Sequence, residues 1–228
     1  MDKVDLYNPI YHQQYGDKKN ICKFTIIGER HSGTNWLERI LVSRLQLPLT
    51  WEYGSKHFIN PSPNHLASGD DTLFVCITRN IYDWIGGFFR LPHHVDKSLT
   101  NNLHDFLLYE WKSDIIDKNY WTNKPYKNIF ELRKSKLEFI HTLLPYIVQN
   151  IVVTRYEDLC VDPEILVSFI SDNFGINKTD NKYYRWTKPK PKPSYLFDRD
   201  ILEIINHNTN WHIEQYFNYS MQNPVLNP

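Results

Sequence analysis

Residues 23–37 read Lys-Phe-Thr-Ile-Ile-Gly-Glu-Arg-His-Ser-Gly-Thr-Asn-Trp-Leu, and this segment decides the fold. It begins as a short apolar run with β-branched residues, passes through a turn bounded by Gly28 and Gly33, and continues with apolar residues at helical spacing. A strand, a glycine-bounded turn and a helix in this order can hold phosphate groups on backbone N–H groups of the turn and of the helix N-terminus. The segment therefore predicts an anion-binding loop.

The two residues after Gly33 indicate which chemistry this loop supports. A loop that binds nucleoside triphosphates carries Lys there to reach the terminal phosphates, followed by Ser or Thr to hold magnesium. This chain has Thr34 and Asn35 instead. A loop with backbone donors and the cation Arg30, but without the magnesium ligand, suits an anionic nucleotide that reacts without a metal. We therefore expect sulfuryl rather than phosphoryl transfer, and no metal site.

Three short motifs follow one another along the chain. Residues 32–36 read Ser-Gly-Thr-Asn-Trp, residues 78–84 read Thr-Arg-Asn-Ile-Tyr-Asp-Trp, and residues 155–159 read Arg-Tyr-Glu-Asp-Leu. In sequence and in order they resemble the nucleotide-site motifs of the sulfotransferases that use 3'-phosphoadenosine-5'-phosphosulfate (PAPS). The resemblance covers residues 23–159. It implies an α/β, three-layer, P-loop-like fold with a central, mostly parallel sheet flanked by helices.

The resemblance assigns the loop residues to the 5'-phosphosulfate of the donor. The family usually has Lys or Arg immediately before Ser-Gly-Thr, whereas this chain has His31 there and Arg30 one residue earlier. Either side chain could supply the cation, and Arg30 is the better candidate because its guanidinium is always charged and fits phosphate oxygens bidentately. Trp36 matches the aromatic residue on which the family stacks adenine, although its helical spacing with Ile40 also suits a core residue. The other loop residues assigned to the nucleotide are Ser32, Gly33, Thr34 and Asn35.

The resemblance places the general base in the loop after the second expected strand. His57 stands where the family has its catalytic His, and a neutral imidazole can take a proton from an acceptor hydroxyl while the hydroxyl attacks sulfur. Lys56 would bind the bridging oxygen or the sulfonate. A surface histidine and a solvated loop lysine are the ordinary alternatives for these two residues.

The remaining motifs are assigned to the 3'-phosphate and the adenine. Arg79 matches the family's 3'-phosphate ligand, and Tyr156 matches its adenine-site tyrosine, with a packed aromatic at a strand end as the alternative. Gly87 replaces the family's Ser on the 3'-phosphate, which removes one hydroxyl donor. A late basic segment with Lys188 and Lys190 matches the family's 3'-phosphate lid by position alone, and a solvated linker is the alternative.

Composition places further limits on the protein. The 228 residues include 26 Lys plus Arg and 26 Asp plus Glu, so the positive and negative charges balance. A protein that binds nucleic acid usually has an excess of basic residues, so we expect no nucleic-acid partner. Three cysteines without zinc spacing indicate a reducing compartment. The N-terminal residues lack the pattern of a secretory signal, and no apolar run approaches the ~18 residues of a membrane span. We therefore expect a cytoplasmic protein that contacts no membrane.

The apolar pattern predicts one domain over residues 1–228, with an N-terminal arm at 1–20, a nucleotide-binding α/β core at 21–175, and a C-terminal basic segment and helix at 176–228. Because strands alternate with helices, we expect a parallel sheet covered on both faces. The expected strands lie near residues 23–27, 49–53, 73–78 and 151–154. The expected helices lie near residues 36–45, 81–90, 103–111, 132–144 with an end at Pro145, 163–174, and from about Asp198 onward.

Together, the residues and the resemblance predict a PAPS-dependent sulfotransferase. It would move a sulfonate group to a hydroxyl, or less readily an amine, of a small-molecule or glycan acceptor and release 3'-phosphoadenosine 5'-phosphate (PAP). A nucleotide kinase is the alternative enzyme, which Thr34 and Asn35 oppose. A catalytically inactive nucleotide-binding module is the third reading, which His31 and Gly87 leave open.

The acceptor is not identified by the sequence. His93 and His94 fall in a loop expected near it, and their adjacency predicts side chains on different sides of the chain. Aromatic residues are the other candidates for lining an acceptor site, although many of them must belong to the core. They are Trp51, Tyr53, Phe58, Phe88, Phe89, Trp111, Tyr120 and Trp121.

Overall fold

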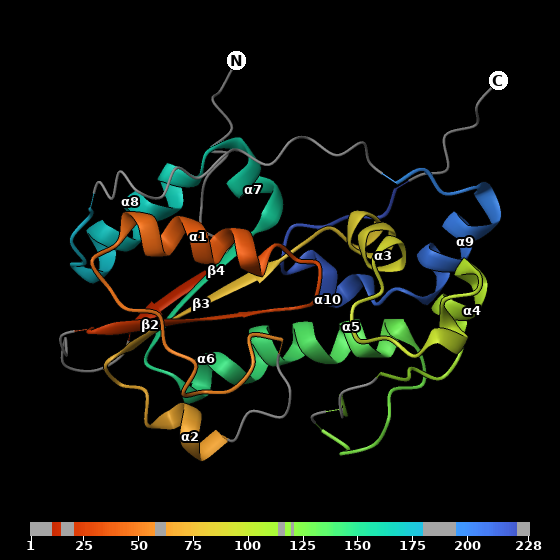
Figure 1. The fold of residues 1–228 in the computed structure, drawn as a ribbon, viewed down its shortest axis with the longest axis horizontal. Helices are drawn as coiled ribbons and strands as arrows, with labels where there is room; N and C mark the ends of the chain where they lie inside the picture. Colours follow the sequence, from red (N-terminus) through yellow and green to blue (C-terminus); the bar gives the residue numbers. More distant parts are fainter. Residues whose placement is uncertain are drawn as a thin grey trace. The chain divides into compact units, whose positions relative to one another are not determined.

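The computed structural model describes residues 11–14, 21–57, 63–113, 117–119, 121–179 and 195–222 (Figure 1). The chain divides into two compact units that are interleaved along the sequence. The first unit comprises residues 1–79 and 142–192, and the second comprises residues 80–141 and 193–228. The expected single domain, with internal boundaries at residues 20 and 175, stays a prediction.

The first unit is built on a four-stranded sheet with the order β1-β4-β3-β2. The strands β2 (Lys23–Gly28), β3 (Thr72–Thr78) and β4 (Asn150–Arg155) are parallel, and β1 (Tyr11–Gln14) pairs antiparallel with β4. Every residue of β3 is buried, which is why its sequence is a continuous apolar run rather than an alternation. The protein is therefore of the α/β class, as the sequence predicts.

Helices lie on both faces of this sheet (Figure 1). On one face are α1 (Thr34–Arg44) and α8 (Pro163–Phe174), and on the other are α2 (Pro63–Ala67) and α6 (Leu144–Ile147). Alternate residues of β3 form a buried core with apolar residues of α1 and α8. A short helix, α7 (Tyr156–Val161), follows β4 directly. The carboxyl ends of β2, β3 and β4 are thus the starting points of the segments that carry the three sequence motifs.

Both ends of α8 confirm the sequence prediction. The side chain of Asp162 accepts a hydrogen bond of 3.0 Å from the backbone N–H of Glu164, and Pro163 occupies the first helical turn. Gly175 follows the last turn with φ of 69°, a left-handed conformation that glycine adopts without a steric penalty. Local capping residues therefore determine the length of this helix.

The strand predicted at residues 49–53 is wrong. Leu49 forms only an isolated bridge with Phe24, and the chain then turns. Tyr53 is buried, with its ring centroid 5.0 Å from that of Phe74 and its hydroxyl oxygen 3.0 Å from that of Thr72. Because Tyr53 must bury its ring and still pair its hydroxyl, this segment leaves the edge of β2 instead of continuing along it.

The predicted helix end at Pro145 is also wrong. Helix α5 (Ile129–Glu138) continues into a π-helical turn, η2 (Phe139–Leu143), and then into α6. Pro145 lies in the first turn of α6. Backbone N–H groups in a first turn have no acceptor within the helix, so the N–H that proline lacks costs no hydrogen bond there. The π-helical turn ends one helix and begins another, so the proline starts a new helix instead of stopping the old one.

Among its described residues, the regular elements of the second unit are helices, with loops and one isolated bridge between Val95 and Ser113. The helix predicted at residues 81–90 is confirmed as α3. The helix predicted at residues 103–111 is shorter, because α4 ends before Trp111. The sequence did not predict α10. Phe88 and Trp111 belong to a buried apolar core, which is the alternative that the sequence left for these aromatic residues. The elements are α3 (Ile81–Arg90), the 3₁₀ turn η1 (Lys97–Leu99), α4 (Leu103–Leu108), α5, α9 (Arg199–Asn208) and α10 (Trp211–Gln215).

A buried ion pair joins α5 to α10 in this unit. The guanidinium of Arg133 donates hydrogen bonds of 2.7 and 2.8 Å to the two carboxylate oxygens of Glu214, and the side chains are only 2% and 1% exposed. The ring of Trp84 lies with its centroid 5.0 Å from the guanidinium carbon. The two charges are therefore compensated inside the core by each other and by an aromatic face.

The expectation that His93 and His94 point to different sides is wrong. Their ring centroids lie 3.9 Å apart. His94 has φ of 58°, and this left-handed turn brings the two neighbouring side chains together, whereas an extended backbone would separate them.

No helix in the described parts of the chain is long and apolar enough to cross a membrane.

Candidate functional site

The candidate site lies in the first unit, where β2 ends and α1 begins. A Cβ atom on Gly28 would lie 2.6 Å from Ile77 Cγ2 and 2.8 Å from both Ser32 Oγ and Thr34 Cγ2. Gly33 has φ of 99°, and a Cβ there would lie 2.4 Å from Tyr156 Cδ2. Close packing therefore requires glycine at both ends of the loop, and the backbone conformation requires it at Gly33 as well.

Hydrogen bonds within the loop hold the turn between these glycines. The N–H and the hydroxyl of Ser32 both donate to the carbonyl of Glu29, at 3.1 and 2.7 Å. His31 has φ of 64°, a left-handed conformation that is uncommon outside glycine. The carbonyl of His31 accepts a hydrogen bond of 3.1 Å from Arg79 Nη1. The loop is thus tied both to itself and to the carboxyl end of β3.

The first turn of α1 has no side-chain cap, because the residue before it is Gly33. The N–H groups of Trp36 and Leu37 both donate to the carbonyl of Gly33 at 3.0 Å. In an uncapped first turn the leading N–H groups concentrate positive partial charge and can bind an anion. The start of α1 and the preceding loop therefore form an arrangement that suits an anionic group.

The two candidate loop cations differ in burial. Arg30 is only 4% exposed, so its side chain lies within the protein and not in solvent. His31 is half-buried. Which of the two supplies the charge for an anionic ligand stays a prediction.

Gly28 also fixes the segment that carries Lys56 and His57. The N–H of Gly28 donates to the carbonyl of Lys56 at 2.7 Å, and the carbonyl of Gly28 lies 3.1 Å from His57 Nδ1. A carbonyl oxygen can only accept a hydrogen bond, so Nδ1 is the donor and the lone pair of the neutral ring is on Nε2. The loop thereby sets the tautomer in which Nε2 can accept a proton.

The ammonium group of Lys56 lies against α1. It donates to the side-chain oxygen of Asn35 and to Glu38 Oε2 at 3.2 Å, and its nitrogen lies 5.4 Å from the centroid of the Trp51 ring. Asn35 stands at the position where a metal-dependent loop carries its magnesium ligand. In this chain the side-chain oxygen at that position accepts a hydrogen bond from the Lys56 ammonium instead of binding a metal ion. Sequence reasoning missed Glu38, although its spacing of three residues from Asn35 places both on one helix face.

Arg79, Tyr156 and Trp36 form a contiguous group beside the loop. The guanidinium carbon of Arg79 lies 4.6 Å from the centroid of the Tyr156 ring, and the Tyr156 and Trp36 rings meet edge to face with centroids 5.7 Å apart. Burial, aided by a hydrogen bond with Cys160, raises the pKa of Tyr156 to about 12, so the phenol stays neutral. Trp36 also packs on the core beneath α1, as its alternative reading requires.

The other predicted site residues belong to other parts of the chain. Gly87 lies on α3 in the second unit. Lys188 and Lys190 lie outside the described residues, as do Phe58 and Tyr120. Their assignments to the 3'-phosphate or the acceptor stay predictions.

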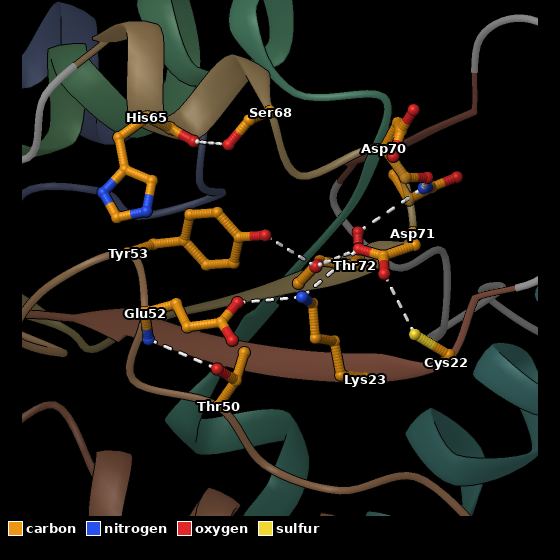
Figure 2. A network of polar contacts seen from close by, with 11 residues as sticks. Cys22, Lys23, Thr50, Glu52, Tyr53, His65, Ser68, Asp70, Asp71 and Thr72 are labelled. Carbon is orange, nitrogen blue, oxygen red and sulfur yellow. Dashed lines mark hydrogen bonds and ion pairs between the residues drawn. The ribbon is translucent and has the colours of Figure 1, made fainter.

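A separate polar network lies at the opposite end of the strands, around the first residues of β2 and β3 (Figure 2). The ammonium of Lys23 lies 2.8 Å from Glu52 Oε2 and 3.6 Å from Asp71 Oδ1. The thiol of Cys22 donates to Asp71 Oδ2 at 3.0 Å, and this hydrogen bond raises the pKa of the thiol. The network therefore holds Cys22 as a neutral thiol, which is the less reactive form.

Comparison of the chain with protein-family models and with curated proteins found no match. Within the described residues, His, Cys, Asp and Glu side chains form no group of three or more that could hold a metal ion.

Proposed function

We propose that the protein is a P-loop-like sulfotransferase that transfers a sulfonate group from PAPS to a hydroxyl group, releasing PAP. The observation that carries the proposal is the ammonium of Lys56 on the side chain of Asn35. This places an ammonium group of the protein beside an uncapped helix start, at the position where a phosphoryl-transfer loop holds its metal. Such a site suits an anionic donor that reacts without a metal ion.

The donor would lie along the carboxyl ends of the parallel strands. Its 5'-phosphosulfate would bind the N–H groups at the start of α1, together with Lys56 and Arg30. Arg79 would bind the 3'-phosphate, since a guanidinium fits phosphate oxygens and this one already borders the loop through the carbonyl of His31. Tyr156 and Trp36, whose rings meet beside Arg79, would contact the adenine.

His57 would act as the general base. Its Nε2 takes the proton of the acceptor hydroxyl while the hydroxyl oxygen forms a bond to sulfur. The bond between sulfur and the bridging oxygen breaks, and its electron pair goes to the 5'-phosphate of PAP. Lys56 and Arg30 stabilise the negative charge that develops on this phosphate. The hydrogen bond from His57 Nδ1 to Gly28 keeps the imidazole in the required tautomer throughout.

Thermal unfolding with a panel of PAP, AMP, ADP and ATP, each with and without magnesium, tests this proposal. At a concentration of one hundred times its Kd, PAP should stabilise the protein by about 2.7 kcal/mol without magnesium, and AMP by much less. Replacing Arg79 by Ala should remove the difference between PAP and AMP. Arg199→Ala is the matched control, because Arg199 is an exposed arginine in the second unit.

The panel also separates the alternatives. Equal stabilisation by AMP and PAP would contradict the role of Arg79, and stabilisation by ATP that depends on magnesium would favour a kinase. An inactive binding module would bind PAP but give no sulfated product when PAPS is supplied with a range of phenols and sugars. Sulfation of any acceptor that is lost in the Arg79→Ala variant would support the enzyme.

A further inference from the structure

The Lys56 ammonium has contacts on several sides. An ammonium has three N–H donors, and two of them bond to Asn35 and Glu38 on α1, while the ring of Trp51 lies on another side. The side chains of Lys56 and Glu38 are 20% and 32% exposed. The pair is therefore partly shielded from water. Two charges in such a setting interact more strongly than they would at the open surface.

Glu38 places a carboxylate next to the proposed anion site. It lies one helical turn after Asn35, close to the helix start that we assign to the phosphosulfate. A negative charge there opposes the binding of an anion directly and also neutralises the cation that would bind it. A site built only for tight anion binding would have no carboxylate on this ammonium.

We propose that Glu38 is an internal competitor for Lys56, which an anionic ligand must displace from the ammonium when it binds. This inference rests on the proposed function in one respect, namely that Lys56 contacts the bound anion. In the free protein Glu38 neutralises Lys56, and in the bound protein a ligand oxygen replaces the carboxylate. Glu38 thereby limits the affinity of the site for anions and shortens the residence time of a product such as PAP.

Substituting Glu38 tests this competition through binding, so no acceptor is needed. Glu38→Gln keeps the size of the side chain and removes its charge, and PAP should bind about three- to tenfold more tightly to the variant, the range expected for a partly buried ion pair. Pyrophosphate should show the same direction of change, because it presents phosphate oxygens without a nucleoside. Calorimetric titration of both anions gives the two Kd values.

Glu52→Gln is the matched control. Glu52 is also a carboxylate paired with a lysine in the first unit (Figure 2). Its partner Lys23 is the first residue of β2, whereas Gly28 is the last. This variant changes the net charge by the same amount but removes no contact of Lys56, so it should leave the affinity for PAP unchanged. An equal gain in Glu52→Gln would show that net charge alone is responsible, and would overturn the competition.

A second background isolates the role of Lys56. In Lys56→Met the carboxylate has no ammonium to neutralise, so adding Glu38→Gln should tighten PAP binding by less than about twofold. An undiminished gain in this background would mean that Glu38 acts only by repelling the ligand. Weaker PAP binding to Glu38→Gln than to the parent would instead make Glu38 a support for Lys56. Either result would overturn the inference.

These outcomes also separate the inference from the proposed function. If PAP binds the parent and Glu38→Gln equally well, the nucleotide assignment stands and the competition is wrong. If PAP does not bind but pyrophosphate does, and more tightly to Glu38→Gln, the competition stands and the nucleotide assignment is wrong. If neither anion binds to either protein, both proposals are wrong.

Discussion

Replacing Gly28 by alanine should destabilise the first unit by about 3 kcal/mol, the upper end of the range for overpacked cores. The new methyl group would lie within 3 Å of Ile77, Ser32 and Thr34. Ile77 is fully buried in the central strand and Ser32 is fully buried in the loop, so neither side chain can move into solvent. The loop must shift instead, which also disturbs the two hydrogen bonds that Gly28 makes to Lys56 and His57.

Thermal or urea unfolding of the parent and the variant measures this cost. For a chain of this size, 3 kcal/mol corresponds to a fall in Tm of about 6 to 12 °C. Gly54→Ala is the matched control, because no atom lies within 4 Å of its added Cβ and only its φ of 99° opposes the substitution. We expect about 1 kcal/mol there. A Gly28→Ala variant as stable as the parent, or more stable than Gly54→Ala, would refute the packing argument.

Three further predictions concern the ion pair, the base and a titrating ring. Arg133→Met should cost about 3 to 5 kcal/mol by leaving Glu214 charged and buried, and the double substitution with Glu214→Leu should recover most of the loss in urea unfolding. His57→Ala should lower the rate of sulfuryl transfer about 10²- to 10⁴-fold with little change in PAP affinity; near-parental turnover would remove its role as base. Burial lowers the pKa of His141 below its ordinary 6.5, so stability present above pH 6.5 is lost as pH falls through the folded pKa. In His141→Phe, Tm should vary less with pH on this acid side, and an unchanged pH profile would contradict this.

The three parallel strands could be predicted because each is buried on both faces. A doubly buried strand reads as a continuous apolar run, and Leu73 to Ile77 is the clearest case. The ends of α8 could be predicted for a different reason, since Asp162, Pro163 and Gly175 act through their own backbone and nearest neighbours. Both kinds of signal are local in the sequence, so no partner has to be known.

The missed elements depend on distant partners. Tyr11–Gln14 shows no apolar alternation, and it becomes a strand because β4 offers an unpaired edge. The segment at 49–53 has strand-like residues, yet Tyr53 instead meets Phe74 and Thr72. Sequence periodicity contains no information about either contact.

The candidate site likewise has features that the sequence predicts and features that depend on distant partners. The glycines of the loop could be read from the sequence because a strand-to-helix turn restricts them locally. The partner of Lys56 could not be read, because it requires knowing that the segment after residue 50 returns to α1. The burial of Arg30 is likewise a property of the packed loop, since the sequence allows it to face either water or the interior.

The interleaving of the two units affects the order in which the chain can fold during synthesis. Tyr11 of β1 pairs with Val153 of β4, so the first strand cannot pair until the last strand of the sheet has been synthesised. At about 5 to 20 residues per second the wait is roughly 7 to 28 s, far longer than a hairpin needs to form. The first segment of the second unit is synthesised during this interval, but that unit also lacks its residues after 193. Neither unit can therefore finish folding before most of the chain exists, so the growing chain exposes the apolar face of β3 to chaperones.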